Sequence, residues 1–396
     1  MRQGVGNAAL VVAFFFPAAA WIAPPACADG GRLESGRDRY QQVCARCHGY
    51  NMVNAGVTSY DLRRFPSDQR ERFRHSVTNG KGNMPAFKGA LSDAEIENLW
   101  LYVSTRGKGQ EPLAVCVAEG NAPYAARANG AASGFDVALA TAIAARLQRP
   151  LKLLWYEVEL EKETSPSLEV NALLSAGLCE LAAGYVLYAP ALGAPAAAAA
   201  RPPDHDGAKP KRQRARVTLE RLIASEPYQA SALTVVLRPG LEGASVRSLA
   251  DLQALRTGTV AGSLAGSILM LYRDGTLRGN LVSLGWRDDP LRELEAGRFD
   301  AALIELNRLD AYRMKNAGTR LAATGYLLPL RFNLGFAALE SRRELIESVN
   351  AILRELQAQG RLSAIALGAG LTHVPARPPF VQPEITLQSL REAAGG

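Results

Sequence analysis

Cys44, Cys47 and His48 have the types and spacing that covalent haem attachment requires. The two cysteines are separated by two residues, and the histidine follows directly. Two thiols at this spacing can each add to a vinyl group of a porphyrin, and the next imidazole then lies beneath the iron as its proximal ligand. A zinc site would need a second close-spaced pair of ligands, which the remaining cysteines do not form. The motif therefore predicts one covalently bound haem c.

The sixth ligand of this iron is predicted to be Met84. It lies in a loop directly before the last predicted helix of the region, and Pro85 fixes the backbone that follows it. Met52, which is close to His48 in sequence, and His75, which would give a bis-histidine site, are the alternatives. Axial ligation by His48 and Met84 leaves no open position on the iron. This interpretation predicts an electron carrier and disfavours a haem enzyme such as a peroxidase.

Two helices are predicted to frame the motif. The first runs into Cys44, and the second begins with a capping box at Ser92. Residues at helical spacing in the two segments are Gly36, Tyr40, Val43, Ile96, Leu99, Trp100 and Val103. We expect the helices to cross at Gly36, which permits a close approach. With Met84 in its loop, this pattern resembles class I cytochromes c, and the resemblance implies a small all-α domain over residues 29–108.

Five arginines cluster in the middle of this first domain: Arg63, Arg64, Arg70, Arg72 and Arg74. Such a run is usually a solvated face. The alternative is that one or two of them neutralise haem propionates or dock an acidic partner protein, because exposed charges mainly accelerate association.

Residues 1–28 are predicted to be a signal peptide. An apolar run over residues 8–20 leads to Ala26-Cys27-Ala28, which has the small-x-small form of a cleavage site. The run is shorter than a helix that spans a bilayer, which disfavours the alternative of an uncleaved anchor. No later segment is apolar enough to insert stably into a membrane. We therefore expect a periplasmic protein that is soluble after cleavage.

The chain length and the net charge further restrict the number of domains and the classes of partner that we expect. The chain that follows residue 28 is longer than a single core usually holds, so two domains are expected. The formal net charge of +7 favours acidic partner surfaces, and export makes nucleic acid an unlikely partner class.

Strand and helix patterns alternate over residues 109–375, which predicts a parallel sheet covered on both faces. Two such α/β lobes are expected. The segments GFDVALATAIAARL, LLSAGLCELAAG, SEPYQASALTVVL, SLADLQ, GTVAGS and ELEAGRFDAALIE follow in this order. Their order resembles type II periplasmic solute-binding proteins, in particular the amino-acid receptors. The resemblance implies a two-lobed periplasmic-binding-protein-like domain with a small-molecule ligand between the lobes.

The ligand chemistry departs from that family. Amino-acid receptors carry an arginine shortly after the third strand, where it binds the ligand carboxylate, but no basic residue lies between Gly184 and Arg201 here. Candidate ligand contacts are Tyr124, Tyr185, Tyr228, Ser263 and Glu305. The alternative is that the tyrosines belong to the core and that the other two cap helices or lie on the surface.

Cys116 and Cys179 are predicted to form a disulfide, because export and an even number of remaining cysteines favour pairing. We expect them near the carboxyl ends of adjacent parallel strands. This pair also resembles the binding-protein-like components that accompany PQQ-dependent methanol and alcohol dehydrogenases. The resemblance implies a quinoprotein dehydrogenase as electron donor, and a docking or maturation role for the second domain.

Two segments are expected to lie outside the compact lobes. Residues 189–216 are rich in Ala and Pro and end in Lys209, Lys211, Arg212, Arg214 and Arg216. This composition predicts a disordered insertion that is either dispensable or a basic docking arm. Residues 376–396 are predicted to be an extended tail that ends in a short helix near 387–394.

Three functions are compatible with these sequence features. The first is a periplasmic electron carrier between a PQQ dehydrogenase and a terminal oxidase or another acceptor, with no catalytic residue of its own. The second is a solute receptor with a haem redox module. The third, a haem enzyme, requires an open iron position.

Overall fold

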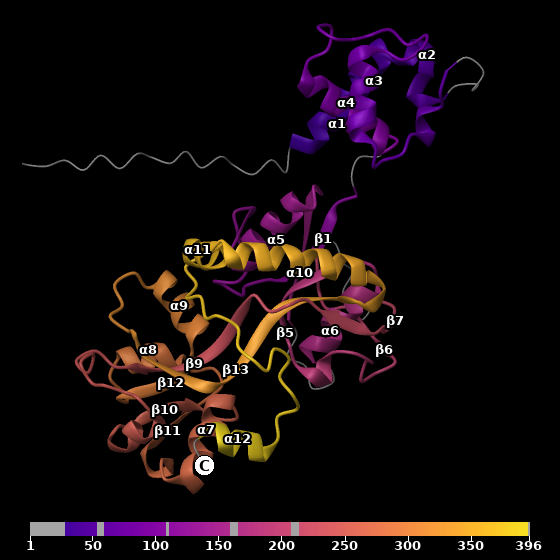
Figure 1. Cartoon of the computed structure of the whole chain (residues 1–396). Helices are drawn as coiled ribbons and strands as arrows, with labels where there is room; N and C mark the ends of the chain where they lie inside the picture. Colours follow the sequence, from indigo (N-terminus) through magenta and orange to yellow (C-terminus); the bar gives the residue numbers. More distant parts are fainter. Residues whose placement is uncertain (1–27, 54–58, 108–110, 159–164, 207–213, 395–396) are drawn as a thin grey trace, which may run out of the picture. The chain divides into compact units, whose positions relative to one another are not determined.

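The computed structural model describes residues 28–53, 59–107, 111–158, 165–206 and 214–394, so nearly all of the predicted signal peptide lies outside the described residues. The chain forms two compact units, Met1–Gly109 and Gln110–Gly396 (Figure 1). The division falls next to the boundary predicted from sequence. Within the described ranges, no helix combines the length and the apolar character needed to cross a membrane.

The described part of the N-terminal unit is helical. Its elements are α1 (Ala28–Val43), α2 (Ala45–His48), η1 (Tyr50–Met52), η2 (Leu62–Arg64), α3 (Arg70–Asn79) and α4 (Asp93–Ser104). The predicted capping box starts α4: the Ser92 hydroxyl accepts from the Glu95 amide, and the Glu95 carboxylate accepts from the Ser92 amide. The core joins Tyr40 of α1 to Leu99 and Tyr102 of α4.

Gly36 determines how closely α1 and α4 approach. A Cβ at this position would lie 2.1 Å from the carbonyl oxygen of Asn98 and 3.2 Å from the Cβ of Tyr102. Any side chain would therefore push the helices apart, and the expected crossing at Gly36 is confirmed.

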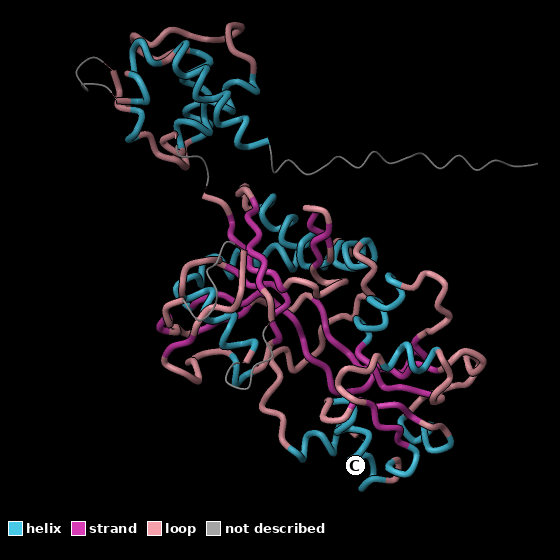
Figure 2. Tube along the Cα trace, turned by 180° about the vertical axis from the view of Figure 1, so that it is seen from behind, coloured by secondary structure: helices cyan, strands magenta, loops and turns pink. Residues whose placement is uncertain are grey.

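The second unit has two lobes on one continuous sheet, with helices on both sides of the strands (Figure 2). The strand order is β11-β10-β12-β9-β13-β5-β1-β4, with β8 paired to β13. The first lobe contains β1 (Leu113–Ala118), β2 (Ala126–Ala128), β3 (Ala131–Ser133), α5 (Phe135–Arg146), β4 (Leu151–Tyr156), α6 (Pro166–Ser175), β5 (Leu181–Val186), β8 (Leu222–Ala224), α10 (Arg343–Ala358) and α11 (Arg361–Gly368). The second lobe contains η5 (Leu249–Ala254), β10 (Thr257–Val260), α7 (Leu264–Leu271), β11 (Leu281–Leu284), α8 (Pro290–Glu295), β12 (Ala301–Glu305) and α9 (Leu306–Lys315).

Two long antiparallel strands, β9 (Gln229–Leu237) and β13 (Ala323–Leu339), join the lobes. In each lobe the other main strands are parallel, as the alternating pattern predicted. Alternate residues of β1 face different cores: Val115 and Val117 pack with α5 and α10, whereas Cys116 packs with α6. The predicted two-lobed α/β fold is thus confirmed.

The insertion over residues 189–216 is structured where it is described. Residues Ala189–Ala191 form the turn η3, and β6 (Ala199–Ala200) pairs with β7 (Val217–Thr218). Arg214 forms an ion pair with Asp204, and the Arg216 guanidinium donates to the Ala199 carbonyl. The prediction of disorder is therefore wrong for these residues, whereas Lys209, Lys211 and Arg212 lie outside the described residues.

The C-terminal tail follows the predicted course. Residues 375–386, here called the C-terminal strap, run along the second unit, and α12 (Leu387–Ala393) then packs against α7 (Figure 1). Halfway along the strap, the Gln382 amide donates to the Leu187 carbonyl and the Ala189 amide donates to the Gln382 carbonyl.

Candidate functional site

The haem-attachment motif forms a single helical turn. The amides of Cys47 and His48 both donate to the carbonyl of Cys44, at 3.1 and 2.9 Å. Both thiols are free; Cys44 is partly buried against the core and Cys47 is exposed. Burial, and then the neighbouring Cys47, raise the pKa of the Cys44 thiol to about 11. Two reduced thiols on one turn beside a histidine form the donor set that covalent haem attachment needs.

The orientation of His48 fits the role of proximal ligand. His48 is 9% exposed, and its Nδ1 lies 2.9 Å from the carbonyl oxygen of Tyr60. A carbonyl only accepts hydrogen bonds, so Nδ1 carries the proton and Nε2 keeps the lone pair that binds a metal. Hydrogen bonding of the second ring nitrogen is the usual way in which ligating histidines are oriented. The role of Tyr60 was not predicted from the sequence, because a backbone carbonyl leaves no signature in residue type.

Met84 lies in a tight turn between α3 and α4. The amides and carbonyls of Lys81 and Met84 bond to each other, at 3.1 and 3.0 Å. Gly80 has a φ of +78°, and a Cβ there would lie 2.7 Å from the Met84 carbonyl oxygen, so the turn needs glycine. The Met84 side chain packs against the same core as Cys44.

The two alternative ligands occupy different environments. Met52 is 1% exposed within the helical core, whereas His75 is exposed on α3. Met52 and Met84 both contact the core that holds Cys44, so ligation by Met84 stays a prediction.

Four of the five clustered arginines have partners within the N-terminal unit. Arg63 pairs with Asp61, Arg70 with Glu97 and Arg74 with Asp93, while Arg72 lies over the ring of Phe65. These contacts within the unit favour the solvated-face interpretation over a dedicated docking patch.

The three candidate tyrosines of the second unit are buried. Tyr124, Tyr185 and Tyr228 are 4%, 6% and 1% exposed. The Tyr228 hydroxyl donates to Asp136 Oδ1 at 2.9 Å and accepts from the Gly184 amide at 2.6 Å. The Tyr185 hydroxyl donates to the carbonyl of Ala191. These hydroxyl groups are engaged in internal hydrogen bonds, as the core interpretation of the tyrosines expects.

Asp136 carries a buried carboxyl group that the sequence patterns do not single out. Burial raises the pKa of Asp136 to about 7, although the hydrogen bond from Tyr228 acts in the opposite direction. The sequence does not indicate that the carboxyl group of Asp136 is buried and hydrogen-bonded, because its partner Tyr228 is far away in sequence.

Ser263 and Glu305 lie at the carboxyl ends of the parallel neighbours β10 and β12. Ser263 caps α7: its hydroxyl accepts from the Gly266 amide and donates to the Val260 carbonyl. Glu305 directly precedes α9 and is partly exposed. The fold thus brings these two candidates to one edge of the second lobe, while the tyrosines belong to the first lobe, with Tyr228 directly before β9. A role for all five in ligand binding stays a prediction.

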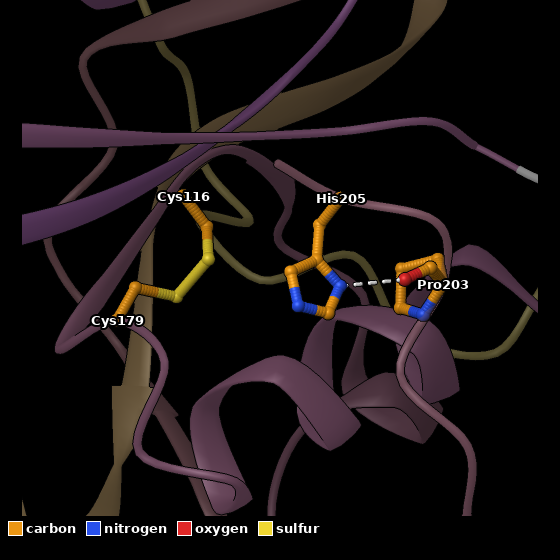
Figure 3. The surroundings of a disulfide bond; sticks show 4 residues. All are labelled: Cys116, Cys179, Pro203 and His205. Carbon is orange, nitrogen blue, oxygen red and sulfur yellow. Dashed lines mark hydrogen bonds between the residues drawn. A yellow bond between two sulfur atoms is a disulfide. The ribbon is translucent and has the colours of Figure 1, made fainter. Parts of the chain in front are cut away.

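The structure contains the disulfide between Cys116 and Cys179, with Cα atoms 5.7 Å apart. Figure 3 shows it beside His205, whose Nδ1 donates to the Pro203 carbonyl at 2.8 Å. Cys179 precedes β5 rather than lying in it, and the expectation that both cysteines lie near the carboxyl ends of strands is wrong. Both are buried, so the bridge links β1 to the start of β5 inside the first lobe.

Comparison with known proteins gives the family of the N-terminal unit. Residues 31–103 match the family described as "Cytochrome C oxidase, cbb3-type, subunit III". A cytochrome c6 from Synechococcus sp. is 38% identical over 87 residues, which are 21% of this chain and 76% of that protein. A cytochrome c6 from Gloeothece citriformis is 34% identical over 107 residues, 26% of this chain and 93% of that protein. Through this unit, the chain belongs to the cytochrome c family, which implies covalently bound haem c.

One further relative is a much longer dehydrogenase, part of which is similar to this chain. The quinohemoprotein alcohol dehydrogenase ADH IIB of Pseudomonas putida is 32% identical over 88 residues, which are 22% of this chain and 13% of that protein.

Solved structures similar to the second unit have low sequence identity. The L-cystine solute receptor of Neisseria gonorrhoeae, in its unliganded open conformation, is 19% identical with a TM-score of 0.46, and the match covers 67% of this chain and 96% of the receptor. A histidine kinase sensor domain with similarity to periplasmic binding proteins is 17% identical with a TM-score of 0.42, covering 67% of this chain and 99% of that domain. The fold of the second unit follows from its strand order and its cores. The chain therefore joins a cytochrome c domain to a two-lobed α/β domain.

Proposed function

We propose that this chain is a periplasmic electron carrier that accepts electrons from a PQQ-dependent alcohol or methanol dehydrogenase and passes them to a terminal oxidase or another acceptor. The observation that carries the proposal is the orientation of His48, whose Nδ1–H donates to the Tyr60 carbonyl and leaves Nε2 for the iron. Cys44 and Cys47 would hold one haem covalently, and His48 and Met84 would bind its iron. The haem, when bound, supplies the one-electron redox couple.

The residues around this site favour electron transfer over bond chemistry. His48 and Met84 would both bind the iron, and no position would then remain on it for a substrate. If it binds the iron, the thioether of Met84 would raise the reduction potential of the haem, which would suit an acceptor of electrons from a dehydrogenase. The chain would thus have no catalytic residue of its own.

The choice of donor rests on two resemblances. The cytochrome-like segment of this chain is similar to part of a quinohemoprotein alcohol dehydrogenase. The disulfide-bearing second unit resembles the binding-protein-like components that accompany PQQ dehydrogenases. We propose that the second unit docks or matures the dehydrogenase, so that the electron carrier and the docking module belong to one chain.

A periplasmic solute receptor with a haem redox module is the second candidate. Ser263 and Glu305 favour it, because both lie at the carboxyl edge of parallel strands, where α/β sheets bind ligands. Their ligand would be a small molecule held between the lobes.

Stopped-flow reduction by a purified PQQ alcohol dehydrogenase tests the first proposal. We expect the full chain to be reduced rapidly, and a chain that ends at Gly107 to be reduced several-fold more slowly, because docking by the second unit would be lost. The N-terminal unit has its own core, which makes the shorter chain a fair comparison. Equal rates for the two chains would contradict the docking role, and no reduction of either would contradict the proposed donor.

A further inference from the structure

Arg331 lies at the point where the strands of the two lobes converge. Val186, at the carboxyl end of β5, pairs with Leu334 of β13. Glu305, at the carboxyl end of β12, pairs with Leu233 of β9. Arg331 pairs with Ala232 of β9 and therefore lies between these two strand ends. In open α/β sheets, ligands bind outside the carboxyl ends of the strands.

A second arginine is brought to this place by the C-terminal strap. The Asn333 amide group donates to the carbonyls of Arg377, Pro379 and Phe380, at 2.9, 3.1 and 3.1 Å. In return, the Arg377 amide donates to Asn333 Oδ1. Asn333 is 3% exposed, so this part of the strap is fixed to β13 from within. Arg331 is two residues from Asn333 on the same strand and projects from the same face, towards the strap.

The charge of these two guanidinium groups is not balanced by a neighbouring acid in the described part of the chain. Among the residues that the structure describes, neither Arg331 nor Arg377 has a carboxylate within ion-pair distance. Partial burial, and then the nearby Arg377, lower the pKa of Arg331. Two adjacent cations that repel each other, one of them partly buried, are stabilised when an anion binds between them.

We propose that Arg331 and Arg377 form a binding site for the carboxylate of a small organic acid. The guanidinium fork is suited to this anion, because two parallel N–H groups match the two oxygens of a carboxylate. The segment after β5, where amino-acid receptors carry their carboxylate-binding arginine, has no basic residue before Arg201. The crossing strand and the strap supply the positive charge instead. This site does not depend on the haem or on the electron donor.

Isothermal titration calorimetry on the full chain tests the site with three carboxylates, acetate, succinate and citrate, and with sulfate as a comparison anion. We expect at least one carboxylate to bind. Its affinity should fall about tenfold or more in Arg377→Gln and in Arg331→Gln, because each variant removes one charge-assisted fork. Arg377 is exposed, so its variant should keep the wild-type melting temperature even if Arg331→Gln does not.

Arg361→Gln is the matched control, since Arg361 is an exposed arginine at the start of α11 in the same unit. This variant should bind like the wild type. Absence of binding by all three carboxylates, or unchanged affinity in Arg377→Gln, would overturn the proposal. Equally tight binding of sulfate would overturn the assignment to carboxylates.

Discussion

The two units differ in how their functional residues are encoded. In the N-terminal unit, Cys44, Cys47 and His48 lie on one helical turn, so local sequence alone brings the donor atoms together. In the second unit, Arg331 and Arg377 come from a crossing strand and from the C-terminal strap, and only the tertiary fold makes them neighbours. A local motif tolerates change elsewhere in the chain, whereas a site assembled from distant segments depends on the packing of the whole unit.

Substitutions in the two cysteine pairs allow the most direct experimental comparison of the two units. Replacing Cys44 and Cys47 together by Ala should abolish covalent haem attachment, because no other thiol lies on this turn. Intact-protein mass spectrometry and haem staining of exported material would show the loss. Retained covalent haem in this variant would contradict the attachment site.

The second cysteine pair should act on stability and not on haem. Replacing Cys116 and Cys179 together by Ala opens a link between residues 63 positions apart, and we expect the unfolding free energy of the second unit to fall by about 2–5 kcal/mol. Denaturant unfolding followed by circular dichroism measures this change. The haem content should stay at the wild-type level, and a parallel loss of haem would show that the two units do not fold independently.

Gly36 tests close packing in the N-terminal unit. Gly36→Ala places a methyl group against the Asn98 carbonyl, and we expect a destabilisation of about 1–3 kcal/mol from overpacking. Gly31→Ala is the matched control on the same helix, because nothing lies within 4 Å of its added Cβ. Thermal unfolding of the two variants should separate them clearly. Equal melting temperatures would indicate that α1 shifts freely on α4.

The buried carboxyl group of Asp136 should make the second unit sensitive to pH. Its folded-state pKa of about 7 is above its unfolded value, so the folded state binds the proton more tightly. The unfolding free energy should therefore decrease as the pH rises from about 4 to about 7, by up to about 1.4 kcal/mol per pH unit. Urea unfolding at several pH values measures this slope.

The Asp136→Asn variant is the control for this titration, since the amide is similar in size and cannot ionise. Its slope over the same pH range should be smaller than that of the wild type. An identical slope in both proteins would assign the pH dependence to other groups.

Features with local causes could be predicted from the sequence. The capping box at Ser92, the crossing at Gly36 and the alternation of strands and helices depend on residue type and on short spacings. The prediction of Cys44, Cys47 and His48 as haem-binding residues rests on the same kind of local pattern. The carbonyl of Tyr60 could not be identified from the sequence. Every residue has a backbone carbonyl, and only the fold determines which one lies beside His48.

Features that depend on residues distant in sequence were either not predicted or predicted wrongly. The composition of residues 189–216 predicted disorder, but the pairing of β6 with β7 and the contact of Arg214 with Asp204 order the described part. The sequence patterns did not single out Arg331, because its proposed role in anion binding depends on Arg377 and on the ends of β5 and β12.

The C-terminal strap limits how far the lobes can separate. One point of it is hydrogen-bonded to Leu187 and Ala189 of the first lobe, and its terminal helix is packed on α7 of the second. Any widening of the angle between the lobes must stretch this tether, break the bonds at Gln382 or detach α12. The tail thus connects the two lobes by a second route, in addition to the strands β9 and β13.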